Sequence, residues 1–367
     1  MRFTIDRMSL LRPLGHVSSV VERRNTIPIL NNMVLRAAAG QLSLTGTDMD
    51  MDIVTHVDCA VATDGASTVS AHMLNDIVRK LPEGSEVEID MADGHAQISA
   101  GRSSFRLPTL PVEDFPAISS SELPHSFTLT AVDLRDMIDT TRFAISTEET
   151  RYYLNGIYFH KSASGGLCAV ATDGHRLALS QMSLPQGADE MPSIILPRKA
   201  VGELRKLLDD QEGDVEVKLS ETRAEFSFGS VHLTSKLIDG SFPDYTRVIP
   251  TGNDKVLSLD KEAFLAAVDR VSTISSDKTR SVKMEIEAGV VRLSASNADA
   301  SSANEEIEVS YDGPAIEIGF NARYLMEVIG QIQGDIVQMS LADTGAPSLI
   351  QAPADDANLF VLMPMRV

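Results

Sequence analysis

The chain has little of several residue types on which common protein classes depend. Among its 367 residues there is no tryptophan, aromatic residues make up 5%, and the two cysteines, Cys59 and Cys168, stand far apart. Isolated cysteines argue against a disulfide framework or a zinc site and fit a reducing cytosol. No uncharged apolar run approaches the roughly 18 residues of a membrane span, and the N-terminus has no apolar signal core, so we expect no membrane association.

Positive charge is also scarce. The 32 Lys and Arg residues are outnumbered by 52 Asp and Glu residues, which gives a net charge of -20. The simplest interpretation is solubility. A chain this acidic should not hold DNA tightly through counterion release. If it handles DNA, either its basic residues are concentrated on one face or the DNA is held by something other than affinity.

Recognisable catalytic motifs are missing too: there is no P-loop, no strand-to-helix GxGxxG, no HExxH and no spaced Cys/His cluster. Alternating Asp48, Asp50 and Asp52 suggest a cation site, and the pair Asp173 and His175 suggests acid–base chemistry. However, Asp48 and Asp173 each follow an apolar strand pattern at a typical turn position. We therefore favour turns and solvated strand faces, and we predict no catalytic residue, no metal and no cofactor.

What the chain does contain is one pattern repeated three times. The three openings, each a short alternating stretch followed by a helical pattern, are Phe3–Leu11, Phe127–Arg135 and Leu257–Leu265. Spacings of three, four and seven predict one apolar face for each helix. The predicted faces of the first helices are Leu10, Leu14 and Val17; Leu134 and Ile138, with Thr141 in an apolar position; and Phe264, Val268 and Val271. Those of the second helices are Leu74, Ile77 and Leu81; Val201, Leu204 and Leu208; and Leu325, Val328 and Ile332.

Each repeat is thus predicted to hold two helices and about eight strands, which is an α+β architecture. We place domain boundaries at 1–122, 123–252 and 253–367. The joints are a Ser/Pro-rich stretch at 118–124 and the breaker cluster Pro250–Asp254. Basic residues fall in or beside the predicted helices, whereas acidic residues are denser in strands and loops. A basic lining on one side and ordinary solvated helix faces both remain open on charge alone.

Several segments resemble one family in its own order along the whole chain. They are Thr26–Leu30, Leu44–Asp48, Arg151–Gly156, Ala171–Leu177, Ser235–Leu237, Phe242–Tyr245 and Met363–Arg366. In these segments the chain resembles the bacterial DNA polymerase III beta subunit, the replicative sliding clamp. The resemblance implies three clamp domains, each with two helices packed on antiparallel sheets, that form half of a closed ring.

The resemblance also implies a function. Two subunits would close head to tail as a homodimer, with helices lining a hole through which double-stranded DNA passes without sequence preference. The ring would be a processivity factor in the cytoplasm rather than an enzyme. Its expected partners are the DNA polymerase III catalytic subunit, the clamp loader, and other polymerases, ligase and repair proteins that carry clamp-binding peptides. A topological tether resolves the charge problem, because sliding needs only weak phosphate contacts.

The resemblance implies three groups of site residues. A peptide-binding groove between the second and third domains would use Leu154, Thr172, Gly174, His175, Arg176, Leu177, Pro243, Val248, Val361, Met363, Pro364, Met365 and Arg366. DNA contacts would come from Arg24, Tyr152, Tyr153, Arg198, Lys199 and Arg205. The dimer interface would use Arg102, Phe105, Arg106 and Leu107 on one side and Ile274, Glu305, Glu306 and Glu308 on the other.

Two departures from the family pattern put details in doubt. Glu148 and Glu149 precede Arg151, and acidic residues there should repel phosphate. The stretch Thr344–Ser348 contains Gly345 and Pro347 and would reshape one wall of the groove. Two other functional classes stay open from the residues themselves. One is a hydrolase that uses Asp173 and His175, and the other is a repeat scaffold that binds proteins without encircling DNA.

Overall fold

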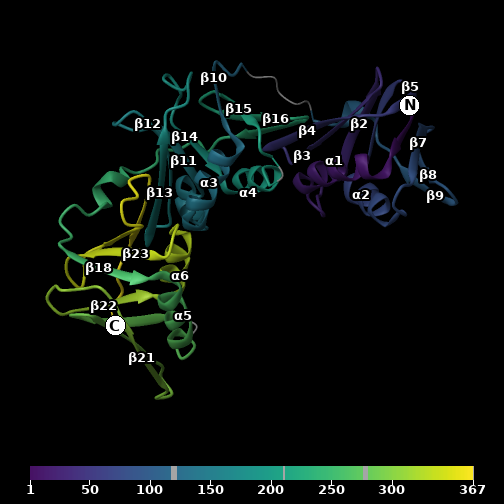
Figure 1. Ribbon diagram of the computed structural model, residues 1–367. Helices are drawn as coiled ribbons and strands as arrows, with labels where there is room; N and C mark the ends of the chain where they lie inside the picture. Colours follow the sequence, from purple (N-terminus) through teal and green to yellow (C-terminus); the bar gives the residue numbers. More distant parts are fainter. Residues whose placement is uncertain (117–121, 210, 276–279, 367) are drawn as a thin grey trace. The chain divides into compact units, whose positions relative to one another are not determined.

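The structure, a computed structural model, describes residues 1–116, 122–209, 211–275 and 280–366. Residues 118–121 of the first predicted joint lie outside these ranges. Two compact units form: Met1–Leu134 with Pro185–Pro192 and Lys199–Leu237, and Arg135–Leu184 with Ser193–Arg198 and Ile238–Val367. Six α-helices and 25 strands occur in the described ranges, which confirms the predicted α+β class (Figure 1). None of these helices is long and apolar enough to cross a membrane.

The first unit is built on an antiparallel sheet of eight strands. In spatial order these are β10 (His125–Thr130), β15 (Asp214–Leu219), β16 (Arg223–Phe228), β17 (Val231–Lys236), β4 (Met51–Asp58), β3 (Gln41–Thr47), β2 (Asn32–Ala38) and β6 (Gly65–Ser70). A second sheet runs β5 (Ala60–Thr63), β1 (Arg2–Asp6), β7 (Glu86–Ala92), β8 (His95–Ala100) and β9 (Ser103–Pro108). Helices α1 (Arg7–Val20) and α2 (Ala71–Lys80) pack on each other, and α1 also packs on β3 and β4.

The second unit repeats this plan. Its eight-stranded sheet runs β18 (Lys255–Asp260), β23 (Ile336–Leu341), β24 (Ser348–Gln351), β25 (Asn358–Leu362), β13 (Arg176–Ser183), β12 (Gly166–Thr172), β11 (Gly156–Lys161) and β14 (Ile194–Pro197). Its smaller sheet runs β21 (Ser302–Glu308), β20 (Val290–Ser296), β19 (Ser281–Glu287) and β22 (Ile316–Asn321). Helices α5 (Lys261–Ser272) and α6 (Ala322–Gln331) pack together and cover these strands. Helices α3 (Ala131–Thr141) and α4 (Arg198–Leu207) contribute residues to both units.

The two eight-stranded sheets share one construction. In each, the opening strand of one repeat leads a group of four strands, and the last of these pairs antiparallel with a strand of the preceding repeat, β17 with β4 and β25 with β13. The central repeat therefore shares one sheet with each neighbour. This sharing explains why three sequence repeats give two compact units, and the domain boundaries at 122 and 252 stay a prediction.

The repeated openings have a physical cause. In each, a strand ends at a residue whose side-chain oxygen caps the next helix: Asp6 accepts from the Ser9 amide, Thr130 from Asp133 and Asp260 from Ala263. Such caps satisfy amides that have no partner inside the helix. The strand-to-helix joint is thus encoded by one short polar side chain at the same place in every repeat.

The predicted helix faces are buried with one exception. In α2 the buried residue is Val78 rather than the predicted Ile77, which is half-exposed. Thr141 of α3 is buried as its apolar position requires, because its hydroxyl donates to the Met137 carbonyl at 2.7 Å and leaves no unsatisfied polar group. Close packing also explains Gly46 on β3, where a Cβ would lie 2.7 Å from Val17 Cγ1 of α1.

Candidate functional site

The predicted groove begins at a tight turn between β12 and β13. Thr172 Oγ1 donates to the Arg176 carbonyl, and Asp173 Oδ1 accepts from the amides of His175 and Arg176. The same bonds form in the first repeat, where Thr47 Oγ1 donates to the Met51 carbonyl and Asp48 Oδ1 accepts from two amides. Asn297 accepts two amides in the third repeat. These bonds confirm the predicted turn role of Asp48 and Asp173.

This geometry leaves little for the hydrolase alternative. Asp173 Oδ1 bonds to backbone amides, and Asp173 Oδ2 accepts from Arg176 Nε at 3.2 Å. The His175 ring instead stacks near Tyr324, with centroids 6.1 Å apart. Of the three alternating aspartates, Asp48 pairs with Lys199 and Asp50 with Lys236. Within the described ranges no group of three His, Cys, Asp or Glu side chains is arranged to hold a metal ion.

Arg176 is the most completely engaged side chain of the predicted groove. It is 7% exposed, and its guanidinium donates to Asp173, to Glu327 on α6 and to the Phe143 carbonyl at 2.8 Å. It also lies against the rings of Phe143 and Tyr324, 5.0 and 4.3 Å from their centroids. Arg176 thus joins β13 to α6 and has little left to offer a ligand. Its assignment to the peptide groove, which the resemblance implies, stays a prediction.

Glu327 completes this arrangement. It accepts from Arg323 at 2.8 Å as well as from Arg176. Burial opposes ionisation of Glu327, but the hydrogen bonds from Arg323 and Arg176 outweigh it and lower the pKa of the carboxyl. The carboxylate is therefore charged at neutral pH and holds the guanidinium in place.

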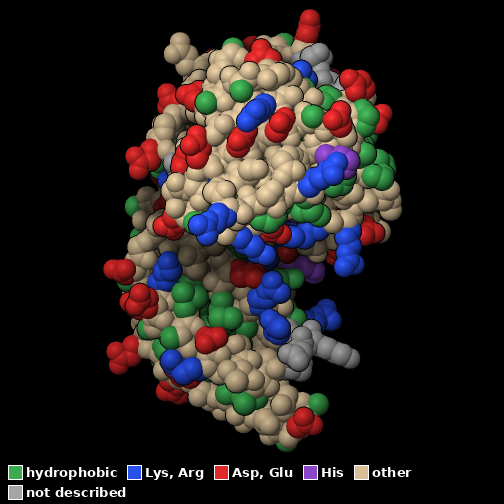
Figure 2. Space-filling view, turned by 90° about the vertical axis from the view of Figure 1, so that its right-hand side faces the viewer, with side chains coloured by type: hydrophobic (Ala, Val, Ile, Leu, Met, Phe, Trp, Pro, Cys, Tyr) green, Lys and Arg blue, Asp and Glu red, His purple; other side chains and the backbone are tan. Residues whose placement is uncertain are grey.

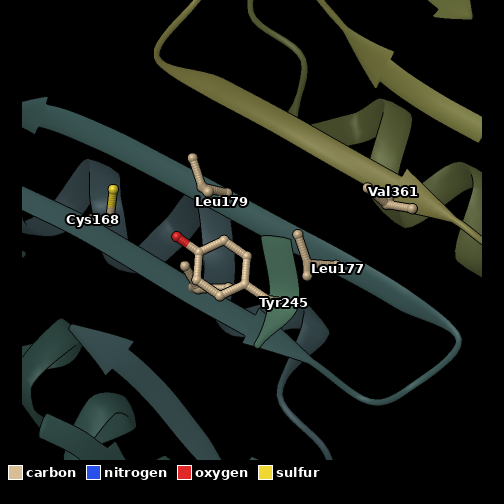
Figure 3. Close-up of a cluster of buried hydrophobic side chains, with 6 residues drawn as sticks. Cys168, Leu177, Leu179, Tyr245 and Val361 are labelled. Atoms are coloured by element: carbon tan, nitrogen blue, oxygen red, sulfur yellow. The ribbon is translucent and has the colours of Figure 1, made fainter. Parts of the chain in front are cut away.

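The floor of the groove is an apolar cluster on the outward face of the eight-stranded sheet. Leu177 of β13 lies opposite Val361 of β25, and Leu179 lies opposite Leu359. The buried cluster consists of Cys168, Val170, Leu177, Leu179, Tyr245 and Val361. Figure 3 shows the Tyr245 ring lying over β12 and β13 with its hydroxyl toward Cys168. Phe242 and Ile249 pack against the same cluster, so both ends of the 242–249 segment contact it, as does Tyr245 within the segment.

The rim of the groove is exposed. Val248 is 47% and Met363 39% exposed, although both are large apolar side chains. The Met363 amide donates to the His175 carbonyl, and the Met365 amide donates to Gly319 on β22. The C-terminal segment is therefore held beside the His175 turn. A buried apolar floor with an adaptable exposed rim suits recognition of apolar side chains.

Tyr245 is held by a histidine whose tautomer is fixed. His160 Nδ1 lies 2.9 Å from the Lys161 carbonyl, which can only accept, so Nδ1 carries the proton and Nε2 accepts from the Tyr245 hydroxyl at 2.9 Å. Burial lowers the pKa of His160, which favours this neutral form. Burial also raises the pKa of Tyr245 to about 12, so the phenol stays protonated.

The segment η4 (Glu149–Leu154) lies against the same turn. A Cβ added at Gly174 would lie only 2.6 Å from Nη1 of Arg151, so no larger residue fits there without a shift of Arg151. Gly174 also has a φ of +87°. Both carboxylate oxygens of Glu148 accept from Arg151. This pairing neutralises one of the two acids that put the loop's DNA contact in doubt. Leu154, at the end of the segment, is buried.

The predicted DNA-contacting residues fall into two groups. In the first unit Lys199 pairs with Asp48 at 2.5 Å and with Glu22 at 3.2 Å. Arg24, two positions after Glu22 in the chain, is exposed. Burial alone would lower the pKa of Lys199, but these two acids raise it. Arg205 pairs with Asp209. Arg198, which precedes Lys199 and is assigned to the second unit, is exposed. On the face drawn in Figure 2, acidic and basic side chains are intermixed.

The second group is the tyrosine pair of the second unit. The rings of Tyr152 and Tyr153 meet edge to face with centroids 5.8 Å apart, and Tyr152 is exposed. Both residues lie against Gly240, just before the groove segment that begins at Phe242. An exposed aromatic ring beside a glycine offers a flat surface to nucleic acid.

The predicted interface residues lie on or beside two edge strands. Phe105, 36% exposed, and buried Leu107 are on β9, the edge of the five-stranded sheet. Glu305, Glu306 and Glu308 are on β21, the edge of the four-stranded sheet, and Ile274 follows α5. Glu305 pairs with Arg270 and Glu306 with Arg292 inside the chain. Two of the three glutamates predicted at the interface are thus already paired with arginines inside the chain.

Several residues of this site were not predicted. Phe143, Tyr324 and Glu327 surround Arg176, and Tyr245 forms part of the floor. Tyr324 and Glu327 are three positions apart in α6, so the sequence could have predicted that they share a helix face. Nothing in the sequence joins Glu327 to an arginine 151 positions away.

Comparison with known proteins agrees with this geometry. Three family descriptions match in order: DNA polymerase III beta subunit, N-terminal domain (1–119), central domain (128–244) and C-terminal domain (246–366). The chain belongs to the DNA polymerase III beta subunit family. It is a sliding clamp by family and thus a DNA polymerase processivity factor with a tethering function.

Individual relatives match over the full length. The beta sliding clamp of Caulobacter vibrioides is 50% identical and that of Escherichia coli K12 is 37% identical, each over 100% of both chains. The crystal structure of the Bartonella birtlesii clamp bound to griselimycin matches with a TM-score of 0.98 and 48% identity over 100% of both chains. A Caulobacter crescentus clamp with polyethylene glycol at its putative beta-motif tethering region matches with a TM-score of 0.97, 50% identity and 100% and 99% coverage.

Proposed function

We propose that two copies of this chain close head to tail into a ring around duplex DNA and tether partners through the groove at Leu177 and Val361. The observation that carries the ring is an incomplete repeat. In both eight-stranded sheets, the last strand of one repeat pairs with a strand of the preceding repeat. In the described part of the chain the third such pairing is missing, and the two strands that would form it, β9 and β21, each lie at the edge of a sheet.

The construction of the sheets identifies the partner of each open edge. Counted along the shared order, β9 occupies the position of β17 and β25, and β21 that of β4 and β13. A second copy completes the sheet by pairing its β21 antiparallel with β9, and two such joints close a homodimer. Unpaired strand edges are otherwise an aggregation hazard.

Side chains at the two edges support this joint. Phe105 on β9 brings exposed apolar surface, whereas Leu107 on the same strand is already buried; Ala303 and Ile307 on β21 are half-buried. Arg102 and Arg106 carry positive charge, whereas Glu308 adds negative charge to the opposite edge. Opposite signs favour the β9–β21 contact over pairing of like edges.

Light scattering tests the ring joint. We expect a dimer at micromolar concentration for the native chain and a monomer for a Phe105→Asp variant, because a charge would be buried in the joint. The matched control is Val256→Asp, an exposed apolar residue on the edge strand β18, which should remain dimeric. A native monomer, or a Phe105→Asp dimer of unchanged affinity, would count against the joint.

The groove is proposed to take short linear peptides from the polymerase III catalytic subunit, the clamp loader, and other polymerases, ligase and repair proteins. Its support is the apolar floor, the exposed Val248 and Met363, and the similarity to a clamp that binds griselimycin. Gly345 and Pro347, in the loop between β23 and β24, are proposed to alter its peptide preference. Titration of griselimycin tests the groove: a Leu177→Asp variant should lose binding, and unchanged binding would refute it.

DNA contact is proposed to be weak and independent of sequence. The cations placed to meet phosphate are Arg24, Arg198, Lys199 and Arg205, with Tyr152 and Tyr153 as a separate surface. Because Lys199 and Arg205 are paired with acids inside the chain, each adds less than a full charge. We therefore expect retention on DNA to depend on ring closure far more than on any of these residues. The same role predicts no chemical step and a cytoplasmic location.

A further inference from the structure

A second hollow lies on the outward face of the first unit's eight-stranded sheet. It measures about 260 Å³ and is lined by Val34, Arg36, Ser43, Thr45, Val112, Phe115 and Pro116. Val34 and Arg36 come from β2, Ser43 and Thr45 from β3, and the last three from the segment around η2 (Val112–Asp114). This volume is slightly below that of a typical drug-sized site, so it suits a fragment-sized ligand.

The repeat explains why space is left here. The pairs Val34–Thr45 and Arg36–Ser43 on β2 and β3 correspond to Tyr158–Val170 and His160–Cys168 on β11 and β12. The segments 112–115 and 242–245 correspond as well when Asp114 is aligned with Asp244. Val112 then occupies the position of Phe242, and Phe115 occupies the position of Tyr245.

The difference between the two sites is a missing aromatic pair. In the second unit the rings of Tyr158 and Phe242 stack with centroids 4.7 Å apart and an interplanar angle of 4°. In the first unit both positions are valine, so the described residues leave the volume of two stacked rings unfilled. The framework that carries an aromatic pair is present, and the pair is absent.

The lining also defines the chemistry of an occupant. Arg36 is exposed, and in the described part of the chain no acidic side chain forms an ion pair with it. Ser43 lies opposite Arg36 and Thr45 lies opposite Val34, so two hydroxyl-bearing residues line the hollow, and Val112, Phe115 and Pro116 supply an apolar wall. A planar guanidinium favours a carboxylate, which it binds through two parallel hydrogen bonds.

We propose that this hollow binds a small aromatic carboxylate. The ring of the ligand replaces the missing aromatic pair between Val34 and Phe115, and its carboxylate pairs with Arg36. Glu113 and Asp114 lie on the adjacent turn but do not line the hollow, and their charge keeps the affinity low. The assignment does not depend on ring closure or on the peptide groove.

Benzoate is the probe, with ligand-observed NMR titration on the full-length chain. We expect saturable binding in the millimolar range and at least about tenfold weaker binding for the neutral analogue benzamide, since a charge-assisted bond is lost. Arg36→Gln should weaken benzoate by the same factor. Val34→Tyr, which fills the hollow as the second repeat does, should abolish binding.

The control is Lys218→Gln, which removes a cation from β15 of the same sheet and should leave benzoate affinity unchanged. Thermal melting checks that Val34→Tyr is folded, and Arg36→Gln alters an exposed side chain and should fold normally. The proposal is overturned by the absence of saturable binding, by equal affinity for benzoate and benzamide, or by unchanged affinity in either Arg36→Gln or folded Val34→Tyr.

Discussion

The two eight-stranded sheets have the same strand order, but the side chains on their outward faces differ in polarity. In the second unit, Leu177 and Val361 lie opposite each other and form part of an apolar floor. The corresponding pair in the first unit, counted from the shared turn, is Asp52 and Thr234. Asp52 is half-buried, so this polar face is itself partly covered, and the burial raises the pKa of the Asp52 carboxyl.

This difference shows that backbone pairing and surface chemistry are set separately. The turns at Asp48 and Asp173 have the same hydrogen bonds, and both sheets have the same antiparallel junction. Inward residues must remain apolar to form a core, whereas outward residues are free to differ. The groove is therefore a property of a few outward side chains on a scaffold that the chain uses twice.

The largest expected effect comes from giving the second turn the residue of the first. Met51 occupies the position of Arg176, so the variant is Arg176→Met. We expect the free energy of unfolding to fall by about 3 kcal/mol, because Asp173 and Glu327 lose their shared cation. Urea unfolding measures it, with the exposed Arg247→Met as control, expected within about 0.5 kcal/mol. A loss below about 1 kcal/mol would contradict the role of Arg176.

Next in size is the turn glycine. Met49 shows that a side chain is accepted at this φ in the first turn, but Gly174→Ala also brings a Cβ against Arg151. We expect a cost of about 2 kcal/mol, falling to about 1 kcal/mol in an Arg151→Ala background. Gly84→Ala, with positive φ and open space, reports the backbone cost alone. Equal costs at Gly174 and Gly84 would show that Arg151 does not restrict the turn.

A milder substitution between the two sheets can be made in the floor of the groove. Val361→Thr introduces the residue of the first sheet at nearly constant shape and places an uncompensated hydroxyl under the ligand. We expect griselimycin affinity to fall about tenfold, measured by calorimetry. Val256→Thr, an exposed position on β18, should have no effect. If both variants bind like the native chain, the floor is not where the ligand lies.

The smallest effect concerns pH. Burial, and then the charge of His232, lower the pKa of His56 in the first sheet. The unfolded chain therefore binds a proton first as pH falls below about 6.5, so this site loses stability between that pH and the lower folded pKa. His56→Gln, the residue found at position 181 of the second sheet, should reduce the stability difference between pH 8 and pH 5 by at most about 1 kcal/mol. An unchanged difference would exclude His56 as a contributor.

Local features of the fold could be predicted from the sequence. The helix faces at Leu10, Val268 and Leu325 follow from spacing, and the turns at Asp48 and Asp173 from short polar residues after apolar strands. The prediction that Ile77 is buried was wrong because Val78 is also strongly apolar, and spacing alone cannot decide which of two adjacent residues faces the core.

The site was less predictable because its contacts are distant along the chain. Arg176, which is predicted to lie in the groove, contacts Glu327, Phe143 and Tyr324, and none of these contacts follows from a local pattern. Glu305 and Glu306, whose place at the interface stays a prediction, each have an intrachain arginine partner. Pairing across such separations depends on how strands and helices meet, which no local pattern encodes.

Retention on DNA tests the central claim most directly. A bacterial clamp loader is used to load the chain onto nicked circular DNA, and the bound fraction is followed by gel filtration before and after a single restriction cut. A ring that holds DNA topologically should stay on the circle and leave once the DNA is linear. Equal retention on circular and linear DNA would contradict the account, because binding would then rest on affinity rather than on encirclement.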